Sequence, residues 1–306
     1  MKRILMAILI IAMLFTACNK TGNKSGDDGK KTVTVTTSFL YDMVKVIAGD
    51  SVNRQLIIPA GEDPHLYLMK PNDATKLKNA DLVLYHGLHF EGKMIEALES
   101  VGVAVAKDFT NDEIGTMEEN GQTNLDPHFW FDIHLYKKAA KVACEELSKL
   151  VPEKSEEYNK NYENYLKELD ELDSYNKERL AEIPKESKYL VTPHDAFNYM
   201  SRYYDIPVMA PQGVSTETEV GVKDMDETAN FIFEHKIKAI FAESTTDPKR
   251  MEALKDSVKK KGFDVKVVQG EGNELFSDSL APEGQFGDNY IDMYKHNIDI
   301  IVENLK

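Results

Sequence analysis

Three of the eight histidines directly follow a proline, namely His65, His128 and His194. Proline fixes φ and cannot continue a β-ladder, so each Pro-His pair indicates a turn that presents its imidazole. Imidazole is the commonest metal ligand in proteins and suits zinc, copper, iron and nickel. One such pair alone more often has a structural role. Three pairs, separated by 63 and 66 residues, exclude a local zinc finger and favour ligands that come from separate loops.

The elements that must position these histidines follow an alternating pattern. Short β-branched runs predict strands at 32–37, 54–59, 81–86 and 103–106, and again at 188–192, 206–210, 239–244 and 264–268. Amphipathic segments between them predict helices, and the last helix is expected at 289–305. This alternation predicts an α/β fold with a mostly parallel sheet, flanked by helices, in each of two lobes. His65 and His194 then lie at the carboxyl ends of strands, where such sheets bind ligands.

One long polar segment separates the two halves of the chain. Residues 152–183 contain no glycine and carry apolar residues at helical spacing. About 30 helical residues would span about 45 Å, so we expect one rigid linker helix between an N-terminal lobe at 32–151 and a C-terminal lobe at 184–306. A coiled-coil dimer is the alternative reading, but the apolar positions keep no strict heptad. We therefore expect a monomer with a ligand site in the cleft between the lobes.

The beginning of the chain predicts export and a lipid anchor. Residues 4–15 are an apolar run that is too short to span a bilayer but suits the core of a signal peptide. The run leads to Ala17-Cys18, which resembles a bacterial lipobox with Phe15 as a departure from its pattern. We expect a signal peptide at 1–17, acylation of Cys18 and a flexible polar tether at 18–31. An ordinary secretory signal is the alternative. Cys144 then has no partner in the chain and is expected to be buried.

Composition limits the possible partners. Hydrophobic residues make up 42% and charged residues 29% of the chain, as in ordinary globular proteins. The 37 Lys and Arg against 52 Asp and Glu give a formal net charge of −15. A nucleic-acid partner is not expected, because phosphate binding needs a basic face.

Several motifs resemble one protein family over nearly the whole mature chain. They are DPHLYLMKPND (63–73), ADLVLYHGLHFE (80–91), DPHFWFD (126–132), VTPHDAF (191–197), QGVSTETE (212–219), FAES (241–244), ELFSDSL (274–280) and YIDMYKHNIDIIVENL (290–305). The chain resembles the metal-receptor lipoproteins of bacterial ABC uptake systems for zinc and manganese. The resemblance implies one metal ion held by His65, His128, His194 and Asp278, with Asp288 as the rival carboxylate. Spacing alone could not have selected Asp278 among the acidic residues.

The resemblance also implies a function and a cellular localisation. We expect a lipid-anchored, extracytoplasmic receptor that captures one divalent ion, Zn²⁺ before Mn²⁺, and delivers it to a membrane permease. A zinc-dependent hydrolase and a surface adhesin with a structural metal are the alternatives. A hydrolytic zinc keeps a position open for water, whereas four protein ligands would close a tetrahedral site. His86 and His89 are expected at the rim of the site.

Overall fold

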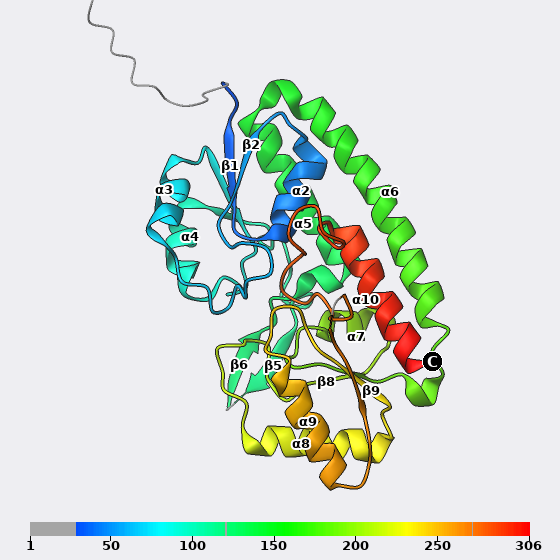
Figure 1. Ribbon diagram of the computed structural model, residues 1–306. Helices are drawn as coiled ribbons and strands as arrows, with labels where there is room; N and C mark the ends of the chain where they lie inside the picture. Colours follow the sequence, from blue (N-terminus) through cyan, green and yellow to red (C-terminus); the bar gives the residue numbers. More distant parts are fainter. Residues whose placement is uncertain (1–28, 120, 271) are drawn as a thin grey trace, which may run out of the picture. The chain divides into compact units, whose positions relative to one another are not determined.

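The first half of the chain folds around a four-stranded parallel sheet in the computed structural model (Figure 1). The strand order is β2-β1-β3-β4, with bounds β1 (Thr32–Val35), β2 (Asn53–Leu56), β3 (Leu82–Tyr85) and β4 (Val103–Ala104). The helices are α2 (Ser38–Ala48), α3 (Pro71–Asn79), α4 (Ile95–Val101) and α5 (Ile133–Leu150). Two side chains cap helix N-termini here, because Thr37 accepts from the amide of Leu40 and Asp132 accepts from that of His134.

The second half repeats this arrangement with shorter strands. Strands β7 (Leu190–Val191) and β8 (Val208–Met209) pair in parallel, as do β9 (Ala239–Phe241) and β10 (Lys266–Val268). Strand β7 also lies close to β9, so the strands follow one another in the order β8-β7-β9-β10, although they form two separate two-stranded sheets. The helices are α7 (Asn198–Tyr204), α8 (Val222–His235), α9 (Lys249–Lys260) and α10 (Tyr290–Leu305). The predicted α/β class with mostly parallel sheets is confirmed.

An antiparallel hairpin was not predicted from the sequence. It consists of β5 (Thr116–Glu119) and β6 (Gln122–Leu125). Its residues are mostly polar and β6 is largely exposed, so no alternation of apolar and polar residues marks the strands.

The long helix α6 (Ser155–Leu180) follows a short 3₁₀ turn, η3 (Pro152–Lys154), and lies beside α2, α5 and α10 (Figure 1). Its apolar stripe is buried against these helices, with Tyr158, Tyr165 and Leu169 each at most 1% exposed. The stripe is therefore covered within one chain, which removes the reason for the coiled-coil alternative.

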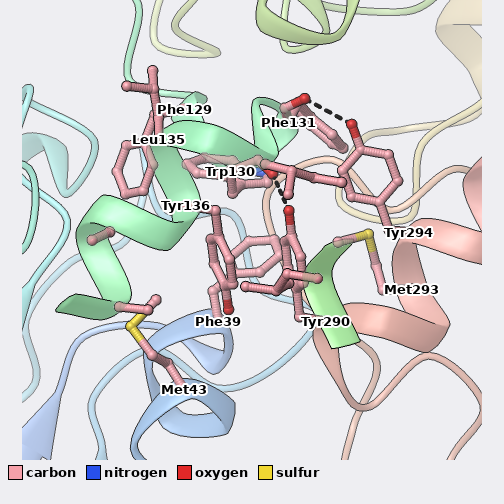
Figure 2. Packing of buried hydrophobic residues seen from close by; sticks show 14 of the residues in the cluster. Phe39, Met43, Phe129, Trp130, Phe131, Leu135, Tyr136, Tyr290, Met293 and Tyr294 are labelled. Atoms are coloured by element: carbon pink, nitrogen blue, oxygen red, sulfur yellow. Dashed lines mark hydrogen bonds between the residues drawn. The ribbon is translucent and has the colours of Figure 1, made fainter. Parts of the chain in front are cut away.

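An aromatic core joins segments from both halves (Figure 2). The rings of Tyr136 on α5 and Tyr290 on α10 stack with centroids 3.7 Å apart. The hydroxyl of Tyr290 donates to the carbonyl of Trp130 at 2.5 Å, and that of Tyr294 donates to the carbonyl of Phe131 at 2.7 Å. Helix α10 is therefore tied to the 3₁₀ helix η2 (Phe129–Phe131), which directly follows His128.

The structure describes residues 29–306, except 120 and 271. Residues Lys31–Lys306 form one compact unit. The expected signal peptide and Cys18 lie outside the described residues. Within the described part of the chain, no helix has both the length and the apolar character needed to cross a membrane. Cys144 is a free, buried thiol, as predicted.

Candidate metal centre

The four side chains selected from the sequence come together in the structure. Each of His65, His128, His194 and Asp278 offers one ligand atom, and these atoms all lie within 4.8 Å of one another. All four residues are buried, with at most 2% of their surface exposed. The group combines three imidazoles with one carboxylate, a set of borderline ligands suited to a divalent transition metal.

Each of the four residues lies in a loop that follows a strand. His65 lies between β2 and α3, and His128 lies between β6 and α5. His194 follows β7 and extends its parallel pairing through a bridge to Gln212. Asp278 lies in the connection between β10 and α10. The first two residues come from the first half and the other two from the second half, so the group spans the junction between the halves.

The ligand atoms surround a common point and lack partners of their own. The Nε2 atoms of His128 and His194 lie 3.3 and 3.2 Å from the carboxylate of Asp278, and that of His65 lies 3.9 Å from it. In the described part of the chain, the Nε2 atoms of all three histidines and both oxygens of Asp278 are buried without a hydrogen bond. Such orphaned polar atoms are costly to bury. A cation at their centre would satisfy them.

Two carboxylates orient two of the imidazoles from behind. The Nδ1–H of His128 donates to Asp126 at 2.7 Å, and that of His194 donates to Glu243 at 2.5 Å. A carboxylate can only accept here, so Nδ1 carries a proton in each ring. In the neutral ring, Nε2 is then the nitrogen whose lone pair is free to bind a metal in the site. This arrangement of carboxylate, imidazole and metal is common in metal sites, where the carboxylate fixes the ring orientation.

His65 is held by packing and by its backbone. The edge of its ring meets Phe90, with centroids 5.1 Å apart and an interplanar angle of 89°. Its amide donates to Asp63 at 2.9 Å. Gly92 has φ +45° and lies so close that a Cβ there would come within 2.4 Å of the His65 carbonyl oxygen. Only glycine allows this approach without a shift of the backbone.

The pKa values of the three histidines reflect burial and the carboxylates next to each ring. Burial lowers the pKa of His65 to about 3, although Asp278 opposes the shift. Burial also acts to lower the pKa of His128, but Asp126 and Asp278 outweigh it and raise the pKa to about 9. For His194, Glu243 and Asp278 likewise outweigh burial and raise the pKa. At His128 and His194, protons and a metal ion therefore compete for Nε2.

Asp288, the rival carboxylate, does not join the group. Its Oδ2 accepts from the amide of Gly284 at 2.7 Å, within the loop before α10. The expectation for His86 was wrong: it is fully buried rather than at a rim, and its Nε2 lies 2.7 Å from the Thr37 hydroxyl. The rings of Phe39, Phe90, Phe129 and Trp130 surround it.

A cavity of about 660 Å³ lies against the site. His65, His89 and Lys93 line it from the first half, and Val214 and Glu217 line it from the second. His89 is therefore placed at the approach to the site, as expected. It adopts a left-handed backbone conformation with φ +62°.

Comparisons with known proteins agree with this geometry. The family of periplasmic zinc-uptake complex component A proteins (ZnuA) matches residues 33–304. The chain belongs to this family. It is 39% identical to the zinc-binding protein TroA of Treponema pallidum over 99% of this chain and 98% of the relative. It is 35% identical to the manganese-binding lipoprotein MntA of Bacillus subtilis over 98% of each protein.

Solved structures of the family share the fold. A structure from a study of the metal-binding specificity of TroA has a TM-score of 0.90 and 61% identity, over 90% of this chain and all of that chain. Members of the ZnuA family are metal-binding components of uptake systems, so the chain is a substrate-binding protein of this kind and not an enzyme.

Proposed function

We propose that this ZnuA-family chain captures one Zn²⁺ ion with His65, His128, His194 and Asp278 and delivers it to an ABC permease in the membrane. The observation that carries the proposal is the cluster of five buried, unpartnered ligand atoms from both halves of the chain. Three neutral imidazoles and one carboxylate around a divalent ion leave a charge of +1.

The identity of the metal rests on the donor set. Nitrogen-rich sites favour zinc over manganese in the Irving–Williams order, and four protein ligands suit the tetrahedral preference of zinc. Mn²⁺ is the second candidate, because it favours carboxylate and water oxygens over imidazole. The relatives include both zinc-binding and manganese-binding proteins.

The geometry disfavours a hydrolase. A catalytic zinc needs an open position and a nearby general base. Glu243 is one acidic group that could be imagined in that role, but its Oε2 accepts from His194 Nδ1 and from the Ser277 hydroxyl at 3.0 Å. It therefore orients a ligand instead of facing a substrate.

We further propose the lobe boundaries and the anchor given by the sequence. The lobes are residues 32–151 and 184–306, joined by the linker at 152–183. Acylated Cys18 holds the protein at the outer face of the cell membrane through the tether at 18–31. The relative MntA is described as a lipoprotein, which supports this anchor. We expect the protein to act as a monomer, because the apolar face of α6 is covered within the chain.

A metal competition experiment tests the proposed cargo. We expect purified metal-free protein, mixed with equal Zn²⁺, Mn²⁺ and Fe²⁺ in excess, to retain one zinc per chain after desalting, because zinc has the highest affinity of the three for this donor set. Elemental analysis by mass spectrometry gives the ratio. Retention of manganese or iron in place of zinc would contradict the proposed cargo, and retention of no metal would contradict metal capture altogether.

A further inference from the structure

Trp130 connects the two halves directly behind the candidate metal centre. It is the one tryptophan of the chain, it is fully buried and it lies in η2, two residues after His128. Its ring meets the His128 imidazole with centroids 5.2 Å apart and an interplanar angle of 66°. Figure 2 shows Trp130 within the aromatic core, near Phe39, Tyr136 and Tyr290.

The indole of Trp130 also reaches the second half. Its Nε1–H donates to the carbonyl of Ser277 at 2.9 Å, and this carbonyl belongs to the peptide bond that leads into Asp278. The hydroxyl of Ser277 donates to Glu243, which in turn holds His194. One side chain from the first half therefore touches His128 and fixes the peptide that precedes Asp278.

We propose that Trp130 is a positioning residue for metal binding, and that its indole N–H sets the place of Asp278 relative to His128. The inference rests on the proposed function of the four ligands. It assigns to Trp130 a role in metal affinity and coordination geometry, beyond its contribution to the core.

The case for this role comes from how Asp278 is held. In the described part of the chain, neither of its carboxylate oxygens accepts a hydrogen bond, and the charged contacts of these oxygens are with the metal-binding histidines themselves. No other side chain holds the carboxylate by a hydrogen bond, so its place depends strongly on the backbone that carries it. The adjacent carbonyl of Ser277 is fixed by the indole. Removal of the indole N–H takes one hydrogen-bond donor from the buried carbonyl of Ser277. The peptide between Ser277 and Asp278 can then move to find another donor. Groups that orient ligands typically change metal affinity about 10–100-fold when they are removed.

Trp130→Phe tests the proposal, because it keeps an aromatic ring and removes the N–H. Tyr294→Phe is the matched control: it also removes one buried donor to a backbone carbonyl in the same core, that of Phe131, which adjoins no ligand. We expect Trp130→Phe to raise the Zn²⁺ dissociation constant about 10–100-fold and to change the visible absorption of bound Co²⁺. We expect Tyr294→Phe to leave both values unchanged.

A second variant separates positioning from loss of the fold. Because Trp130 is the one tryptophan, β-(3-benzothienyl)alanine can replace it alone, with sulfur in place of the N–H and the ring size kept. We expect this protein to show the same weaker zinc affinity and altered Co²⁺ spectrum. A dissociation constant within twofold of wild type in the folded analogue, or an equal shift in Tyr294→Phe, would overturn the proposal. If wild-type protein itself binds no zinc, the proposed function fails instead.

Discussion

Asp278→Ala should abolish tight metal binding. The variant leaves three imidazoles around a divalent ion with no buried negative charge beside it. Removal of one partner from a buried, charged pair costs about 3–5 kcal/mol, which corresponds to a loss of affinity of roughly 100-fold to several thousandfold. Isothermal titration calorimetry with Zn²⁺, in the presence of a competing chelator, measures this loss.

The rival carboxylate provides the control. Asp288→Ala should bind Zn²⁺ as tightly as wild type, because Asp288 accepts a hydrogen bond within its own loop and lies outside the four-residue group. The same contrast applies to histidines: His194→Ala should lose tight binding, whereas His235→Ala, at an exposed position on α8, should not. Undiminished affinity in Asp278→Ala or His194→Ala would refute the ligand assignment.

Cys18→Ala should release the protein from the membrane or block its processing. The thiol of Cys18 is the attachment point for the proposed lipid, and the polar tether with a chain of net charge −15 offers no other affinity for an anionic bilayer. Fractionation of cells into membrane and soluble parts, followed by detection of the protein, measures the change.

The alternative of an ordinary secretory signal gives the opposite result. If residues 1–17 are removed without acylation, Cys18→Ala should not alter the distribution of the protein between the two fractions. A normally processed Cys18→Ala protein that stays in the membrane fraction would contradict the lipid anchor.

Much of the architecture follows from the order of elements in the sequence. Alternating β-branched runs and amphipathic segments predicted the parallel sheets, and the apolar stripe at 152–183 predicted α6. The hairpin at 116–125 escaped this reasoning because its strands are mostly polar, so their pairing depends on backbone hydrogen bonds that leave no hydrophobic pattern.

The site was predictable only in part. Each Pro-His turn marked one imidazole, and the loop order placed His65 and His194 at strand ends. Apart from the family resemblance, no pattern around Asp278 marks it as a ligand. It lies in the long connection between β10 and α10, and only the path of this loop brings it to the histidines. Glu243 contacts His194, which lies 49 residues earlier in the chain. Trp130 contacts the carbonyl of Ser277, which lies 147 residues later and next to Asp278. Only the three-dimensional structure shows such contacts. His86 was misplaced because its position after β3 says nothing of the aromatic rings that cover it.

Anomalous X-ray diffraction from crystals of the zinc-loaded protein, recorded on both sides of the zinc absorption edge, would locate the metal and identify its ligands. We expect one strong zinc peak per chain, with the Nε2 atoms of His65, His128 and His194 and a carboxylate oxygen of Asp278 about 2.0–2.2 Å away. A dominant zinc peak elsewhere on the chain, or one that contacts Asp288 in place of Asp278, would contradict the proposed metal site.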